Sequence, residues 1–255
     1  ITVTNPGTIS GATEYGQKLA ELDRSLENFV DTLPDDTVIV LTGDHGESIT
    51  CRGSALQFLL KRLREKLRFG RGWDTRPVEW LSNRMLNDSG PDIPDHFIEN
   101  GHDQAIFDFV TQVPLVIQHQ KLPKKTVTAQ CRQVDIFPTL LDILDISYDG
   151  TIDGQSLLPP DGVSDRPAYI RGCGEQLKGK ANWMRGIRYD GYKYIQYPNR
   201  SWSAELYDLE EDPNEMTPIT DPNTKQELEA LLPSSNLRRS DTLDIQDHLE
   251  ELGYL

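Results

Sequence analysis

Residues 37–47 read Thr37-Val38-Ile39-Val40-Leu41-Thr42-Gly43-Asp44-His45-Gly46-Glu47. The β-branched run at 38–41 predicts a strand buried on both faces, which is typical of parallel sheets covered by helices. We expect the strand to end at Thr42-Gly43, because glycine permits a sharp turn. Asp44 and His45 then lie at the carboxyl end of the strand, where open α/β sheets bind their ligands. A carboxylate beside an imidazole at this position is a candidate metal site.

The sequence before this strand predicts an amphipathic helix over residues 13–33. Thr13 suits the N-cap, and Pro34-Asp35-Asp36 ends the helix and leads into the strand. Apolar residues recur at helical spacing, namely Tyr15, Leu19, Leu22, Leu26, Phe29, Val30 and Leu33. A helix followed directly by a strand is half of a βαβ unit, so we expect an α/β domain with a mostly parallel sheet flanked by helices.

Four stretches of the chain, in this order, resemble the sulfatase family of the alkaline phosphatase superfamily. They are Leu41–Glu47, Gly101-His102 with Val113–Ile117, Val134–Leu141, and Leu206–Leu209 with Glu211–Pro213. The resemblance extends from about Tyr15 to about Pro213, apart from residues 50–100. It implies an alkaline-phosphatase-like α/β fold, of which this chain forms the carboxyl-terminal part.

The resemblance also implies roles for three residues. Asp44 and His45 correspond to metal ligands, and His102 stands where sulfatases place a lysine or histidine that contacts the anionic group or a metal. The expected cofactor is a divalent cation, calcium first, with manganese and zinc as alternatives, because oxygen and nitrogen ligation suits each of them. The implied activity is metal-dependent hydrolysis of sulfuric esters, on a small molecule or a glycan.

The nucleophile is the part of the site that the sequence lacks. Sulfatases form it from a cysteine or serine in a Cys/Ser-x-Pro-x-Arg setting ahead of the metal pair. Cys51-Arg52-Gly53-Ser54-Ala55 lacks the required proline and arginine and follows the pair. We therefore expect the nucleophile in a missing amino-terminal half and an inactive chain without it. Two alternatives stay open: a phosphoester-cleaving relative, such as a phosphonate or phosphodiester hydrolase or a phosphoethanolamine transferase, and an inactive remnant or binding module.

The long spacing between His45 and His102 indicates an insertion over residues 50–100, above the mouth of the site. Residues 55–69 predict an amphipathic helix with leucines on one stripe. Its other face is basic, with Lys61, Arg62, Arg64, Lys66 and Arg68. We favour a solvated face, and the alternative is a lid that attracts an anionic substrate. We also expect His102 to approach His45 despite the insertion.

The rest of the chain predicts a packing helix and a second, smaller subdomain. Asp135 suits the N-cap of a helix whose buried face is formed by Leu140, Leu141, Ile143, Leu144 and Ile146. The Gly- and Pro-rich residues 150–160 mark a boundary, so we assign 1–160 to the catalytic domain and 161–255 to an antiparallel subdomain. Strands are expected at 168–171, 183–188, 193–196 and 205–209, with a hairpin at Asp190-Gly191 and helices at 223–232 and 242–252.

Composition narrows the possible partners. The chain has 255 residues and a formal net charge of −15, which argues against a general nucleic-acid binder. Cys51, Cys131 and Cys173 follow no metal-binding or paired spacing, so we interpret them as reduced thiols. No apolar run approaches the ~18 residues needed to span a membrane. No signal peptide is visible, and Ile1 reads as a position in mid-domain.

Overall fold

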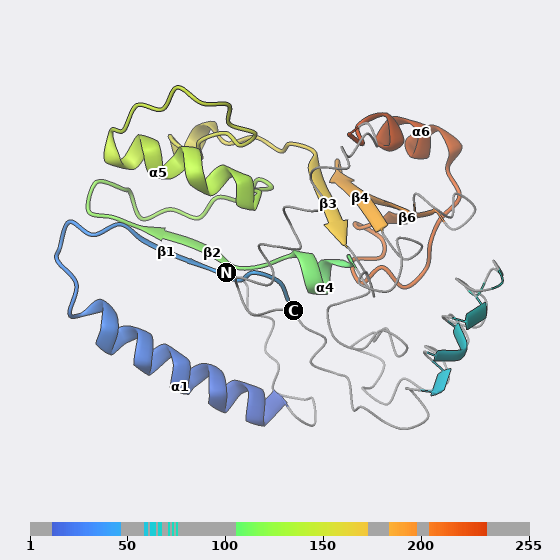
Figure 1. Cartoon of the computed structure of the whole chain (residues 1–255), viewed down its shortest axis with the longest axis horizontal. Helices are drawn as coiled ribbons and strands as arrows, with labels where there is room; N and C mark the ends of the chain where they lie inside the picture. The colour runs from blue at the N-terminus through green and yellow to red at the C-terminus, as the bar shows by residue number, and fades with distance from the viewer. Residues whose placement is uncertain are drawn as a thin grey trace.

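The computed structural model describes residues 12–46, 106–172, 184–197 and 204–233, together with 59, 60, 62–64, 66, 67, 71, 73 and 75. These residues form an α/β arrangement of helices and two small sheets (Figure 1). The elements are α1 (Ala12–Val30), β1 (Ile39–Thr42), α4 (Asp108–Thr111), β2 (Leu115–Gln118), η2 (Gln133–Asp135), α5 (Ile136–Leu144), η3 (Pro160–Gly162), β3 (Ala168–Gly172), β4 (Met184–Tyr189), β5 (Tyr192–Gln196), β6 (Glu205–Asp208) and α6 (Pro222–Ala230).

Helix α1 and strand β1 confirm the helix–turn–strand unit, with shifted ends. The helix begins at Ala12, one residue before the expected cap, and ends at Val30 rather than at residue 33. The expectation that the strand is buried on both faces is wrong, since the Leu41 side chain is 42% exposed. Within the described residues β1 pairs with β2 alone, so its other edge has no partner strand there.

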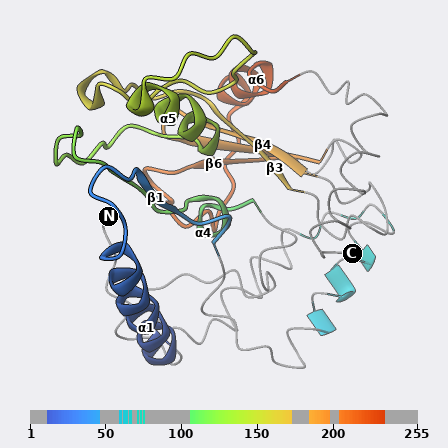
Figure 2. The ribbon, with the colours of Figure 1, turned by 60° about the vertical axis from the view of Figure 1, so that its left-hand side comes forward.

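Strands β1 and β2 pair in antiparallel register, from Ile39 opposite Gln118 to Thr42 opposite Leu115. The helix followed by a strand had predicted that β1 pairs with parallel strands. The observed pairing with β2 is antiparallel, because the segment before β2 lies at the carboxyl end of β1. Helix α4 touches Gly46 there, so the strand that follows must run back along β1. The two views place this ribbon between α1 and α5 (Figures 1 and 2).

The second sheet confirms the antiparallel strands that were predicted after residue 160. Its order is β3-β4-β5-β6, so each strand pairs with its neighbour in sequence. The β4–β5 hairpin turns at Asp190 and Gly191, whose φ angles are 51° and 75°, as a type I′ turn requires. Helix α6 begins after the Asp221 cap and packs with Leu228 on one face of the sheet.

Ile106 joins the α4 segment to the second sheet. Its side chain is 1% exposed. It belongs to a core cluster with Met184, Ile195, Tyr197, Tyr207 and Leu209. The segment that follows residues 101–105 is therefore anchored on the antiparallel sheet by burial of apolar surface.

Helix α5 forms where predicted, but its buried face is shorter. Asp145 adopts a left-handed conformation, with φ of 53°, and ends the helix. Ile146 therefore lies beyond the helix and is 52% exposed, and Leu144 is 48% exposed. Ile143 is buried, as expected, and Leu140 and Leu141 are half-buried.

The described residues between 59 and 75 contradict the expected orientation of the basic helix. Arg64 is buried, whereas Leu59 and Leu63 are exposed. The predicted leucine stripe thus faces solvent at these two positions. His119 is also buried. No helix in the described part of the chain is both long and apolar enough to cross a bilayer.

Candidate functional site

Asp44 and His45 lie in the loop that follows β1. The backbone N–H of His45 donates to Asp44 Oδ1 at 2.9 Å, which turns the carboxylate toward the imidazole. Asp44 Oδ2 and His45 Nε2 are 3.5 Å apart. The side chains are 80% and 40% exposed, so both remain accessible from solvent.

The His45 ring is oriented by the next residue. Its Nδ1 lies 2.9 Å from the Gly46 carbonyl oxygen. Because a carbonyl only accepts hydrogen bonds, Nδ1 carries the proton, and Nε2 bears the lone pair that a cation binds. Metal-to-ligand distances are about 2.0–2.6 Å for nitrogen and oxygen, so donors 3.5 Å apart suit one ion. This donor pair fits a divalent cation.

Gly46 fastens the end of this loop to α4. Its N–H donates to the Val110 carbonyl oxygen at 2.6 Å. A Cβ atom at this position would lie 2.0 Å from the Phe109 carbonyl oxygen, which is closer than any side chain allows. Only glycine permits the approach. The sequence suggested a glycine for turning at Gly43, whereas the close contact at Gly46 is visible only in the structure.

Gln133 holds the other end of the loop. Its Nε2 donates to the Gly43 carbonyl oxygen at 2.8 Å and lies 3.4 Å from the Asp44 carbonyl oxygen. Sequence reasoning missed this residue, because its partners are about 90 positions away. The nearest indication in the sequence was the stretch that resembles the sulfatase family, which starts at the next residue, Val134.

A buried group of charged side chains supports α4. Lys193 is 0% exposed, and its Nζ lies 2.8 Å from Asp108 Oδ1 and 2.9 Å from Glu215 Oε1. The Glu215 carboxylate also accepts from the Asp108 N–H at 2.5 Å, and Arg188 pairs with Asp108 at 3.0 Å. These contacts join α4 to β4, β5 and the segment after β6.

The environment shifts the pKa values of the Glu215 and Asp108 carboxyl groups in opposite directions. Burial raises the pKa of the Glu215 carboxyl to about 7, and the nearby Lys193 charge offsets only part of that effect. For Asp108, burial acts to raise the pKa, but the Lys193 and Arg188 charges together hold it below its usual value. Asp108 is therefore the ionised carboxylate of the pair near neutral pH.

The other predicted site residues fall outside the described residues. His102 lies in the span 101–105, and Cys51, with its neighbours, lies in the span 47–58. The expected approach of His102 to His45 stays a prediction. Within the described ranges, no group of three or more His, Cys, Asp and Glu side chains lies close enough to hold a metal. The site described here therefore has two predicted ligands, Asp44 and His45.

Two family models match overlapping parts of the chain. The model described as Sulfatase matches residues 3–146, and the model described as N-sulphoglucosamine sulphohydrolase, C-terminal, matches residues 102–241. Among curated relatives, arylsulfatase K of Gallus gallus is 32% identical over 147 residues, covering 51% of this chain and 26% of the relative. N-acetylglucosamine-6-O-sulfatase of Bacteroides thetaiotaomicron is 30% identical over 117 residues, covering 42% and 21%.

Solved structures share the fold. A protein solved in complex with its substrate D-glucosamine-2-N,6-O-disulfate superposes with a TM-score of 0.52 at 21% identity, covering 85% of this chain and 37% of that one. The phosphonate monoester hydrolase of Agrobacterium radiobacter gives a TM-score of 0.50 at 21% identity, covering 91% and 39%. The chain spans about a quarter of the length of the curated relatives. Each of the two family models matches more than half of the 255 residues, and the chain belongs to the sulfatase family.

Proposed function

We propose that this chain forms part of a metal-dependent hydrolase of sulfuric esters in which Asp44 and His45 bind the cation. One observation carries the proposal: Asp44 Oδ2 and His45 Nε2 converge at 3.5 Å, at the end of a strand, in a chain of the sulfatase family. The Gly46 carbonyl oxygen supports it, because it fixes the tautomer in which Nε2 is a ligand.

The two side chains have complementary tasks. Asp44 supplies a hard, negatively charged oxygen, and His45 supplies a neutral nitrogen. When bound, a divalent cation neutralises the negative oxygens of a sulfate ester and lowers the cost of attack on sulfur. Calcium is the first candidate, with manganese and zinc as alternatives. Two ligands leave a cation mostly hydrated, so further ligands are expected from a preceding part of the domain.

The proposal extends to His102 and to the nucleophile. His102 is expected to donate to an anionic oxygen of the ester, because it follows the metal pair and precedes β2 in the family order. The nucleophile is expected from an amino-terminal segment in a Cys/Ser-x-Pro-x-Arg setting. The chain of 255 residues is therefore expected to be inactive when that segment is not supplied.

The proposed substrate is a sulfate ester on a glucosamine-type sugar. Support comes from the names of related proteins: an N-acetylglucosamine-6-O-sulfatase, a family model for N-sulphoglucosamine sulphohydrolase, and a structural neighbour solved with a disulfated glucosamine. The phosphonate hydrolase among the solved neighbours shares the fold, and phosphorus esters are therefore a useful comparison substrate.

The test measures metal-dependent turnover of several esters by the full-length protein that contains this chain and by its variants. We expect calcium- or manganese-dependent release of sulfate from glucosamine 6-sulfate and from an aryl sulfate, and much slower cleavage of an aryl phosphate or phosphonate. Asp44→Ala should abolish metal retention and turnover, because it removes the charged ligand. Asp36→Ala is the matched control, since Asp36 is an exposed aspartate before β1.

Full activity in Asp44→Ala would show that this carboxylate is not a ligand. Faster cleavage of the phosphorus esters than of the sulfates would instead place the protein in the phosphoester-cleaving branch of the superfamily.

A further inference from the structure

The backbone of the Asp44 loop is held at two points that lie far apart in sequence. Gln133 donates to the Gly43 carbonyl oxygen at 2.8 Å and lies 3.4 Å from that of Asp44. The Gly46 N–H donates to Val110 on the far side of the loop. The peptide groups before and after Asp44 are therefore both constrained, and they set the direction of its side chain.

Gln133 is itself presented by a rigid turn. It begins η2, a single 3₁₀ turn that ends at Asp135. Asp135 is 0% exposed and accepts from the Arg132 N–H at 2.9 Å and from Arg132 Nη2 at 2.8 Å. These two hydrogen bonds close the turn around Gln133.

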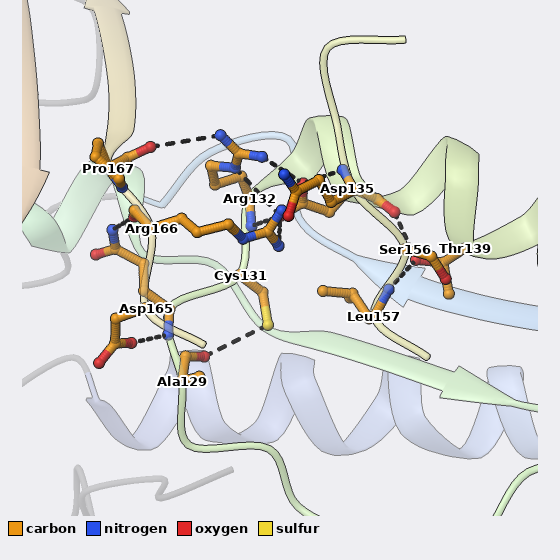
Figure 3. A network of polar contacts seen from close by, with 12 residues as sticks. Ala129, Cys131, Arg132, Asp135, Thr139, Ser156, Leu157, Asp165, Arg166 and Pro167 are labelled. Atoms are coloured by element: carbon orange, nitrogen blue, oxygen red, sulfur yellow. Dashed lines mark hydrogen bonds and ion pairs between the residues drawn. The ribbon is translucent and has the colours of Figure 1, made fainter. Parts of the chain in front are cut away.

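The Asp135 carboxylate also ties the turn to two other segments. Arg166 donates to it at 3.0 Å and the Gln155 N–H at 2.9 Å, while Thr139 closes the first turn of α5 by donating to the Asp135 carbonyl oxygen (Figure 3). Burial acts to raise the pKa of Asp135, but the hydrogen bonds from Arg132 and from the Gln155 backbone outweigh it and hold the pKa low. The carboxylate therefore stays ionised near neutral pH and keeps its ion pairs with Arg132 and Arg166.

The Asp44 side chain needs this support, because it is 80% exposed. An exposed aspartate has several accessible rotamers, and the entropy lost when cation binding selects one of them lowers the affinity. A backbone that is already fixed reduces this cost. Asp135 ends the turn that Gln133 begins, and Gln133 contacts the loop through the Gly43 and Asp44 carbonyl oxygens. Gln133 therefore links the Asp135 network to the loop of residues 43–46.

We propose that Gln133 is a positioning residue, which fixes the backbone at Asp44 and so aims the carboxylate at the cation. This inference rests on the proposed function for the identity of the ligand, but the clamp itself can be tested without any metal. The side chain needs both an amide donor and sufficient length to reach the Gly43 oxygen.

Two substitutions separate these requirements in the full-length protein. Gln133→Met keeps the length and removes the donor, and Gln133→Asn keeps the donor and removes the reach. Gln118→Met is the control, because Gln118 is exposed and lies at the opposite end of the β1–β2 ribbon from the loop. Each protein is measured for its calcium and manganese dissociation constants, its melting temperature and amide hydrogen exchange of residues 43–46 without metal.

We expect both Gln133 variants to bind calcium and manganese about 3- to 10-fold more weakly, the loss typical of one neutral hydrogen bond. Hydrogen exchange of the His45 and Gly46 amides should accelerate in both Gln133 variants, while their melting temperatures stay unchanged. The Gln118→Met protein should match the parent in all three measurements. Unaltered exchange in both variants overturns the clamp. Accelerated exchange in a protein whose wild type binds no cation supports the clamp and rejects the metal site, so the two failures are distinguishable.

Discussion

At the residue scale, the decisive position is Gly46. A methyl group there would lie 2.0 Å from the Phe109 backbone oxygen, so alanine forces the loop of residues 43–46 away from α4. We predict that Gly46→Ala lowers the free energy of unfolding by about 1–3 kcal/mol and weakens cation binding at least as strongly as the Gln133 variants. Urea unfolding and calcium titration measure the two effects.

Gly16→Ala provides the matched control for this substitution. Gly16 lies inside α1, and a Cβ added there meets nothing within 4 Å. Alanine should therefore stabilise the helix by about 0.5–1 kcal/mol. A Gly46→Ala protein that gains stability in the same way, with normal calcium affinity, would contradict the close contact that we describe.

The sequence predicted residues that act through local spacing and missed those that act across the fold. Asp44 and His45 follow a β-branched strand directly, so their placement could be read from neighbouring positions. Gln133 and Glu215 carry no local pattern of this kind, because their partners are brought to them by tertiary packing. The same limit applies to the burial of Arg64 and His119, which no local pattern in the sequence indicates.

At the element scale, α4 depends on the buried contact between Lys193 and Glu215. The pKa of Glu215 is raised from 4.5 to about 7, so the folded state binds a proton more tightly than the unfolded chain. The stability that this proton provides is complete below pH 4.5 and is lost as the pH rises through about 7. The effect of Asp108 on stability has the opposite pH dependence. Because its pKa is lowered, it contributes stability that is lost only as the pH falls below 3.8.

We predict that Glu215→Gln removes the first of these dependences. The free energy of unfolding of the variant relative to the parent should increase between pH 4.5 and about 7, by an amount on the order of a few kcal/mol. Urea unfolding at a series of pH values measures this difference. Parallel pH profiles for the two proteins would mean that Glu215 titrates at an ordinary value.

The elements themselves were predicted well where the signal is periodic or rests on turn chemistry. The Asp190-Gly191 turn fixed the β4–β5 hairpin, because both residues tolerate a positive φ. The direction of β2 relative to β1 could not be predicted, since it depends on α4 returning the chain to the end of β1. The end of α5 was missed because Asp145 adopts a left-handed conformation that its sequence context does not signal.

At the scale of the whole molecule, the layer around β1 and β2 has apolar surface that faces solvent. Exposed positions on α1 include Leu22, at 54%, and Phe29, at 60%, and Leu41 and Val116 are exposed on the ribbon. Apolar surface of this extent promotes association. We predict that the 255-residue chain expressed alone forms concentration-dependent oligomers in sedimentation velocity experiments.

Replacing Leu22 and Phe29 together by lysine should shift that chain toward the monomer, because the charges oppose burial of α1. The control is replacement of Gln17 and Asn28 by lysine, which adds the same charge at exposed positions of the same helix without removing apolar surface. A parent chain that stays monomeric at high concentration would show that the exposed faces of α1 and the ribbon do not associate.

The central claim is that Asp44 and His45 bind one divalent cation, and anomalous diffraction tests it most directly. Crystals of the full-length protein grown with manganese should show one anomalous peak about 2.0–2.6 Å from an Asp44 carboxylate oxygen and from His45 Nε2. We expect this peak in the parent protein and its loss in Asp44→Ala. A fully occupied manganese ion in the active site that contacts neither Asp44 nor His45 would contradict it.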